Sequence, residues 1–208
     1  MKHGTVHCSA MTERPIEEPA DAELIARTLG GSESAFEQLA RRHRPRLFQI
    51  ASRYARDEHE LADIAQEIFV KAYFALDKFR GDAPFEHWLS RIATRTCYDH
   101  LRSRQRKPET TFSELTEDQN GWLERCGAAD SVAQEEALAS AKEAKEVVAL
   151  VLERLSPADR MVITLLELED KTVEEVASLT GWSKTLVKVR AFRARKTMKR
   201  IIEGLQHE

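Results

Sequence analysis

The densest run of side chains able to do chemistry lies near the C-terminus, where cations recur without an intervening acid. Eight of them fall between residues 184 and 202: Lys184, Lys188, Arg190, Arg193, Arg195, Lys196, Lys199 and Arg200. A helix that carries lysine and arginine at this density can bind the phosphate groups of a nucleic acid. A solvated amphipathic helix is the simpler alternative. The residues that flank this run favour DNA binding.

Those flanking residues give positions 173–192 the layout of a helix-turn-helix. Thr172 and Glu175 form a capping box that starts a short helix, and Gly181 ends it. Ser183 can then cap the last and longest helix. In such a motif the second helix places its N-terminal residues in the major groove of DNA. The sequence therefore predicts a DNA-reading helix that begins at Ser183.

A second cationic stretch, residues 85–104 and the positions just after it, interleaves aromatic residues with its charges. At helical spacing one side carries His87, Arg91, Arg95, Tyr98, Arg102 and Arg106, and another side carries Phe85, Trp88, Leu89, Ile92 and Ala93. Arginine neutralises phosphate, while tyrosine and histidine can stack on an unpaired base. We expect the first side to bind nucleic acid and the second to be buried.

A further basic cluster has two interpretations that the sequence leaves open. It consists of Arg41, Arg42, Arg44, Arg46, Arg53 and Arg56. These arginines either extend the DNA-binding face or are simply solvated on the outside of a helix.

The expected helix 59–77 has two unlike faces. At 100° per residue its core face holds Leu61, Ile64, Ala65, Ile68, Ala72 and Leu76. The opposite face holds Asp63, Gln66, Glu67, Val70 and Phe74. Apolar residues within an acidic and polar patch indicate a docking surface for another protein. A helix that packs on both sides is the alternative.

The motifs that usually carry catalysis are missing from the sequence. It has no glycine-rich phosphate loop, no HExxH motif and no pair of closely spaced cysteines, so we expect neither an enzyme nor a cofactor. The three cysteines, Cys8, Cys97 and Cys126, are odd in number and suit a reducing compartment. His3, His7 and Cys8 lack a fourth ligand, so no metal site is expected there.

The elements that position these residues are expected to be helices throughout. The chain has 208 residues with only 8 glycines and 6 prolines, which favours an all-α fold. The net charge of −3 says little about partners. No run approaches the length of a membrane span, and the first residues do not resemble a signal peptide. We therefore expect a cytoplasmic protein.

The chain is expected to form two small helical domains joined by a flexible acidic linker. The expected parts are a flexible lead-in at 1–20, a first domain at 21–107, a linker at 108–134 and a second domain at 135–208. Residues 108–136 hold eight acids and one arginine, a net charge of −7. We expect the domains to tumble semi-independently unless a partner clamps them. Pro45 is expected to interrupt or restart the helix that runs through Phe36 and Leu39.

Taken together, these segments resemble the sigma-70 family of RNA polymerase sigma factors, in its extracytoplasmic-function (ECF) subgroup. Region 2 of that family is resembled by FEQLARRHRPRLFQIASRY and ELADIAQEIFVKAYFALDKFRGDAPFEHWLSRIATRTCYDHLRSRQRK, which hold its D-x-x-Q-E-x-F and W-L-x-x-I-A patterns. Region 4 is resembled by LERLSPADRMVITLLELEDKTVEEVASLTGWSKTLVKVRAFRARKTMKR. The segments keep the family's order and spacing.

The resemblance implies a subunit that binds core RNA polymerase, directs it to promoters and initiates transcription at minus-10 and minus-35 elements. Core polymerase binding would fall on Asp63, Gln66, Glu67, Phe69, Val70 and Phe74, although Phe69 points more toward the core. Minus-10 recognition and melting would fall on Arg80, His87, Arg91, Arg95, Tyr98 and Arg102. Minus-35 recognition would fall on Ser183, Lys184, Thr185, Lys188, Arg190 and Arg193.

The same resemblance implies core RNA polymerase, promoter DNA and an anti-sigma protein as partners, with no membrane insertion. Val189 and Ala191 depart from the family's pattern, which leaves the minus-35 sequence open. Two other functions remain as alternatives. A helix-turn-helix regulator would not explain residues 36–106, and an adaptor would bind polymerase without starting transcription.

Overall fold

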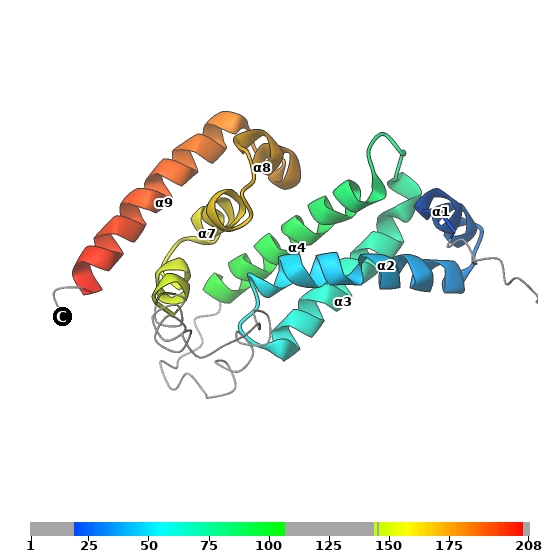
Figure 1. Ribbon diagram of the computed structural model, residues 1–208, viewed down its shortest axis with the longest axis horizontal. Coiled ribbons are helices and arrows are strands. Elements are labelled where there is room, and N and C mark those ends of the chain that lie inside the picture. Colours follow the sequence, from blue (N-terminus) through cyan, green and yellow to red (C-terminus); the bar gives the residue numbers. More distant parts are fainter. Residues whose placement is uncertain (1–18, 107–143, 145, 206–208) are drawn as a thin grey trace, which may run out of the picture.

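The computed structural model describes residues 19–106, 144 and 146–205, and every regular element in these ranges is a helix. The N-terminal half contains α1 (Asp21–Leu29), α2 (Glu33–Ser52), α3 (Glu58–Ala75), the short 3₁₀ helix η1 (Leu76–Lys78) and α4 (Phe85–Arg106). The C-terminal half contains helical residues 146–153, α7 (Pro157–Ile163), the π-helical stretch η3 (Thr164–Leu168), α8 (Val173–Thr180) and α9 (Lys184–Leu205). The predicted all-α fold is confirmed (Figure 1).

The core of the N-terminal half lies where α2, α3 and α4 pack together. The predicted core face of α3 is confirmed, because Leu61, Ile64, Ala65, Ile68 and Ala72 are all buried. From α4 the core receives Phe85, Leu89, Ala93, Cys97 and Leu101. A helical repeat of apolar residues on each element thus places the polar faces of α3 and α4 outward.

Helix α2 runs through Pro45 without a break, so the predicted interruption was wrong. Proline removes one backbone hydrogen bond and disfavours a helix interior by about 3 kcal/mol. Leu39 before the proline and Leu47 and Ile50 after it are all buried in the same core. Packing on both sides of Pro45 therefore holds α2 in one piece.

The predicted helix-turn-helix is formed by α8 and α9. The Thr172 hydroxyl accepts a hydrogen bond from the Glu175 N–H at 3.2 Å, and the Glu175 carboxylate accepts one from the Thr172 N–H at 2.8 Å. Gly181 has φ 76°, a left-handed conformation that ends α8. The Ser183 hydroxyl accepts from the Leu186 N–H at 3.2 Å and caps α9. Each predicted cap is confirmed.

The capping box makes a stability prediction. Replacing Thr172 with alanine removes the acceptor for the Glu175 N–H, and we expect the free energy of unfolding to fall by about 1 kcal/mol. Urea denaturation followed by circular dichroism measures this change. Ser178→Ala, at an exposed position in the middle of the same helix, is the matched control and should leave stability unchanged within about 0.5 kcal/mol. Equal stabilities of the two variants would contradict the prediction.

The two halves pack against each other, because α4 contacts both α7 and α8 (Figure 1). Residues 160–165 are buried without a break, so this segment is enclosed between α4 and α9 rather than being amphipathic. Cys97 and Leu101 of α4 belong to the same apolar cluster as Met161 and Val162 of α7. The expectation of semi-independent domains therefore differs from the structure. The linker at 108–134 lies outside the described residues.

Candidate functional site

The outer face of α3, here called the α3 surface, is exposed as predicted. It consists of Asp63, Gln66, Glu67, Val70 and Phe74. Val70 is 47% exposed and Phe74 is 76% exposed, which is unusual for residues of their size in a helix with a well-formed core. The Asp57 carboxylate caps the start of the helix by accepting from the Glu60 N–H at 2.8 Å. The alternative of a helix packed on both sides is excluded within the described residues.

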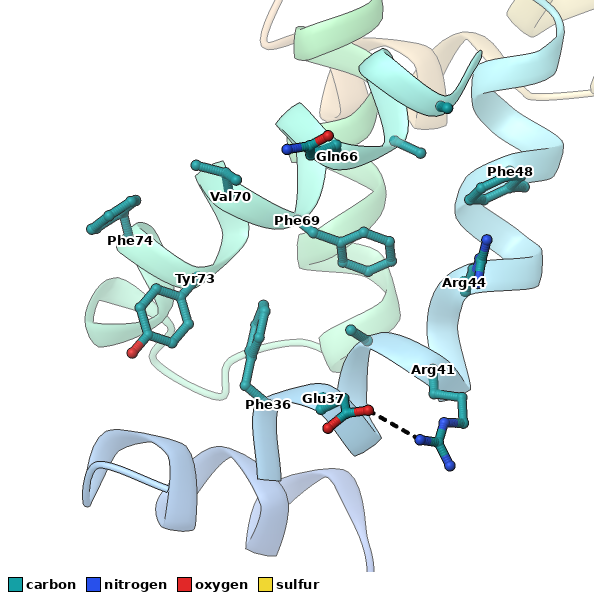
Figure 2. Close-up of a pocket in the computed structure, with 13 residues that line it drawn as sticks. Phe36, Glu37, Arg41, Arg44, Phe48, Gln66, Phe69, Val70, Tyr73 and Phe74 are labelled. Carbon is teal, nitrogen blue, oxygen red and sulfur yellow. Dashed lines mark hydrogen bonds and ion pairs between the residues drawn. The ribbon is translucent and has the colours of Figure 1, made fainter. Parts of the chain in front are cut away.

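An apolar groove of about 590 Å³ runs beside the α3 surface, between α2 and α3 (Figure 2). Phe69 is half-buried in it, which agrees with the expectation that this residue points toward the core. Phe36 of α2 meets Tyr73 of α3 edge to face at 4.9 Å between ring centroids. Phe48 is covered by the guanidinium of Arg44, 4.8 Å from its ring centroid. A partner that contacts Phe74 can therefore extend into an aromatic groove.

Sequence reasoning missed the contribution of α2 to this groove. Phe36 and Phe48 lie 12 positions apart in the sequence, and neither belongs to the predicted α3 pattern. The signal was the presence of two phenylalanines, Phe36 and Phe48, in a helix that is otherwise rich in arginine. It becomes informative only once α2 is known to pack on α3.

The α4 surface carries the cations that the sequence placed there. Arg91, Arg95 and Arg102 are exposed on the helix, and His87 is exposed in its first turn. Arg80 is exposed in the loop before α4, in which Gly81 has φ 77°. Tyr98 is only half-exposed, because its ring meets Trp182 of the C-terminal half edge to face at 5.3 Å. Trp88 packs with Phe79 and Phe85 in the core, as the sequence predicted for Trp88.

The α9 surface is cationic along the whole helix. Its buried stripe of Val187, Ala191 and Ala194 leaves an exposed set made of Lys184, Thr185, Lys188, Arg193, Arg195, Lys196, Lys199 and Arg200, with Ser183 exposed at the cap. Phe192 is 70% exposed among these cations. Three of these cations make exposed ion pairs: Lys184 with Glu174, Arg195 with Glu167 and Lys199 with Glu203. Arg190 differs in being half-buried, with its guanidinium 3.5 Å from Asp159 and 5.1 Å above the Trp182 ring. Arg190 is thus held inside the chain.

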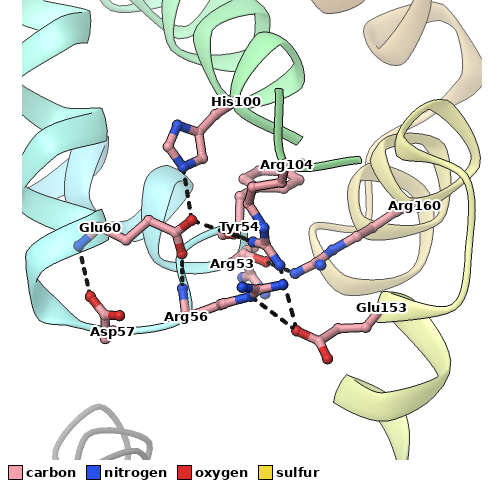
Figure 3. A network of polar contacts seen from close by, with 9 residues as sticks. All are labelled: Arg53, Tyr54, Arg56, Asp57, Glu60, His100, Arg104, Glu153 and Arg160. Carbon is pink, nitrogen blue, oxygen red and sulfur yellow. Dashed lines mark hydrogen bonds and ion pairs between the residues drawn. The ribbon is translucent and has the colours of Figure 1, made fainter. Parts of the chain in front are cut away.

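Each arginine of the basic cluster in the N-terminal half has a partner within the chain, so neither sequence interpretation describes it fully. Arg41 binds Glu37 at 3.2 Å, and Arg42 binds Asp21 at 2.6 Å. The other partners are Phe48 for Arg44, Glu86 for Arg46, Glu169 for Arg53 and Glu153 for Arg56. Arg41 and Arg44 have their partners within α2, Arg42 and Arg46 contact α1 and α4, and Arg53 and Arg56 join the two halves, where Figure 3 shows the Arg56–Glu153 pair.

Neither a redox group nor a metal-binding cluster accompanies these surfaces in the part of the chain that the structure describes. Burial raises the pKa of the Cys97 thiol to about 12, so this cysteine is an unreactive core residue. Three or more potential metal ligands do not gather anywhere among residues 19–106 and 146–205. His3, His7, Cys8 and Cys126 lie outside the described residues. Within those same ranges, no helix is long and apolar enough to cross a membrane.

Comparison with known proteins identifies both halves. Residues 39–107 match the family model for sigma-70 region 2, and residues 145–198 match the model for sigma-70 region 4. The ECF RNA polymerase sigma-E factor of Escherichia coli (strain K12) is 34% identical over 189 residues, which cover 91% of this chain and 97% of that protein. The RNA polymerase sigma-H factor of Pseudomonas aeruginosa is 31% identical over 193 residues, covering 93% and 99%.

Solved structures agree with this result. CnrH in complex with the cytosolic domain of CnrY is 29% identical, with a TM-score of 0.53, and the match covers 89% of this chain and 99% of that one. The sigma factor RpoE of Bartonella quintana, in complex with the anti-sigma factor NepR, has a TM-score of 0.50 at 20% identity. The match to it covers 81% of this chain and 96% of that one. The chain belongs to the sigma-70 family and, within it, to the ECF RNA polymerase sigma factors.

Proposed function

We propose that this chain is a dissociable subunit of RNA polymerase that binds the core enzyme, directs it to specific promoters and opens the DNA there. The observation that carries the proposal is the difference in charge and polarity among three exposed surfaces. The α3 surface is acidic and apolar, whereas the α4 and α9 surfaces are cationic. One side of the molecule thus suits a protein and the others suit nucleic acid.

Core polymerase is the partner that we assign to the α3 surface. Val70 and Phe74 provide exposed apolar area toward the C-terminal end of the surface, and Asp63, Gln66 and Glu67 place polar groups beside them on the preceding turns. Protein interfaces commonly combine an apolar centre with a polar rim, and complementary charge sets their orientation. We assign residues 21–107 to sigma region 2, residues 108–134 to an acidic linker and residues 135–208 to sigma region 4.

Promoter DNA is the partner that we assign to α4 and α9. On α4, arginines 91, 95 and 102 would hold the phosphates while Tyr98 stacks on an unpaired base of the minus-10 element. On α9, the capped N-terminus at Ser183 would place Lys184, Thr185 and Lys188 in the major groove of the minus-35 element. Lys196, Lys199 and Arg200 lie too far along the helix to reach base edges and would bind phosphate.

Tyr98 provides a test of base stacking. We expect Tyr98→Ala to weaken binding of the polymerase complex to single-stranded minus-10 DNA by about 1–3 kcal/mol, because one stacked base loses its aromatic partner. Tyr98→Phe keeps the ring and should bind nearly as well as the original chain. Fluorescence anisotropy of a labelled oligonucleotide measures both. Equal affinities for the alanine and phenylalanine variants would contradict a stacking role.

An anti-sigma protein is the further partner that we propose. The exposed Phe74 and the aromatic groove beside it leave apolar area uncovered in the free chain, and a second protein can cover it. CnrH, which is 29% identical to this chain, was solved in complex with the cytosolic domain of CnrY. A protein bound at the α3 surface would exclude core polymerase from the same residues.

Holoenzyme formation tests the proposal as a whole. The purified chain should comigrate with core polymerase on size-exclusion chromatography, and only the complex should protect promoter fragments from nuclease. A chain that binds promoter DNA equally well without polymerase would instead be a helix-turn-helix regulator. A chain that binds polymerase but gives no promoter protection would be an adaptor.

A further inference from the structure

Two exposed apolar side chains lie among the cations of α9, and the roles proposed for the polar residues of this helix do not explain them. Val189 is 41% exposed and Phe192 is 70% exposed. The buried stripe of the same helix, which packs on α7 and α8, consists of Val187, Ala191 and Ala194. A single exposed apolar residue is ordinary on a protein surface. An apolar residue near the end of a helix that would enter a DNA groove is in a position to contact the ligand.

Val189 lies on the side of α9 that is turned away from the rest of the chain. It comes two positions after the buried Val187 and two positions before the buried Ala191. At about 100° per residue, it is therefore about 160° from each of them around the helix axis. Thr185, one turn earlier, is exposed on the same side. Val189 thus lies at the centre of the face that a ligand of α9 would cover.

The position of Val189 along α9 also suits a contact with base edges. It is the sixth residue of the helix and directly follows Lys188. Its Cα is therefore about 7.5 Å along the axis from that of Lys184, and the major groove of B-DNA is about 12 Å wide and about 8.5 Å deep. The Ser183 cap fixes this end of the helix. A helix end that brings Lys184 and Lys188 to the bases would bring Val189 with them.

The cations around Val189 determine which kind of ligand can cover it. Lys188, Arg193 and Lys196 are exposed beside it, so the ligand must carry negative charge next to an apolar group, because burying unpaired cations is costly. Duplex DNA meets both requirements. Its phosphates border the groove, and the C5-methyl group of thymine is the apolar group that its base pairs present there. Against the polar edge of another base, valine would leave a donor or an acceptor without a partner.

We infer that Val189 packs against the C5-methyl group of a thymine in the minus-35 element and thereby selects thymine at that position. The inference rests on the proposed function for the contact between α9 and DNA, and it adds one base and the residue that reads it. Removing one methyl group from such a contact should weaken binding about fourfold. Because Val189 departs from the family's pattern, this preference distinguishes the chain from relatives that carry a polar residue there.

The test combines a change in the DNA with a change in the chain. The full-length chain in complex with core polymerase first selects its preferred duplex from a pool of random minus-35 sequences. Each thymine of that duplex is then replaced, one at a time, with uracil, which lacks the C5-methyl group and keeps the hydrogen-bonding groups of the base. Fluorescence anisotropy measures the affinity of each duplex for the complexes of the original chain and of Val189→Ala.

Val189→Ala is suitable because it removes both γ-methyl groups from an exposed position without opening a cavity in the core. Alanine also has a higher helix propensity than valine, so α9 should be retained, and circular dichroism checks this. Ile202→Ala is the matched control. Ile202 is another β-branched residue of α9, 39% exposed and more than three turns beyond Val189. It should lie outside the groove.

We expect uracil at one thymine position to weaken binding of the original chain and of Ile202→Ala about fourfold, and to leave binding of Val189→Ala unchanged. Each comparison is between two duplexes bound to the same variant. A general loss of affinity or stability in Val189→Ala therefore cancels, and the difference that remains reports the contact between the two groups.

Several results would overturn the inference. They are a preferred duplex without thymine, no effect of uracil at any position, and a uracil effect of equal size in the original chain and in Val189→Ala. Weaker binding of Val189→Ala to core polymerase in the absence of DNA would also overturn it, because Val189 would then contact protein. Sequence-selective binding without a methyl effect at Val189 would leave the proposed function intact. A polymerase complex that binds every duplex equally well would contradict the proposed function and, with it, the inference.

Discussion

Replacing both Asp63 and Glu67 with lysine is expected to weaken binding to core RNA polymerase by about 100-fold or more, on the order of 3 kcal/mol. Both carboxylates are exposed on the α3 surface, with Glu67 one turn and Asp63 two turns before Val70. The double change reverses the charge beside the exposed apolar pair Val70 and Phe74, so a complementary cationic partner would be repelled. Biolayer interferometry with immobilised core enzyme measures the affinity.

The same double variant should fold normally, which separates binding from stability. Neither carboxylate is buried, and the structure gives Glu67 one surface ion pair, to Lys71 at 2.7 Å, worth about 0.5 kcal/mol. Lysine at the exposed Glu167 and Glu203 positions makes the same change in net charge in the other half and serves as the control. The α3 assignment fails if the α3 variant binds as tightly as this control.

Lys188→Ala is expected to weaken binding to the preferred minus-35 duplex by about 1–3 kcal/mol, if Lys188 reads a base. Lys188 is exposed on the second turn of α9, whose N-terminus is fixed by the Ser183 cap. Affinities for the preferred site and for single-base variants, measured with the polymerase complex at one salt concentration, give both strength and specificity. An equal loss on every sequence would make Lys188 a phosphate contact.

Lys199→Ala is the matched control for this prediction. Lys199 is an exposed lysine on the same helix, three turns farther from the N-terminus, and pairs with Glu203 at 3.7 Å. We expect Lys199→Ala to cause a smaller loss of affinity that is independent of DNA sequence, because the C-terminal end of α9 would lie outside the major groove. A larger sequence-dependent loss at Lys199 than at Lys188 would place the reading surface elsewhere on α9.

Much of the fold could be predicted because it depends on residues close together in the sequence. The caps at Thr172 and Ser183 require residues only three positions apart, and both are present in the structure. The core and outer faces of α3 follow from the helical repeat alone. The exposed positions of the α3 residues and of most α4 and α9 cations follow in the same way.

The remainder depends on contacts between residues far apart in the sequence. The continuity of α2 through Pro45 follows from packing on α3 and α4, which a local rule for proline does not contain. The pairing of Arg53 with Glu169 joins residues more than a hundred positions apart, and the sequence around neither residue predicts it. Arg190 was assigned to the DNA surface from its place on α9, yet the fold brings Asp159 and Trp182 to it.

Transcription from a pool of genomic fragments tests the central claim most directly. Purified chain and core RNA polymerase are incubated with the pool, and the 5′ ends of the transcripts are mapped. The proposed function predicts transcripts that require the chain, start at discrete positions and share two upstream sequence elements, and that are lost with the Asp63→Lys and Glu67→Lys variant. Transcripts that are the same with and without the chain would contradict it.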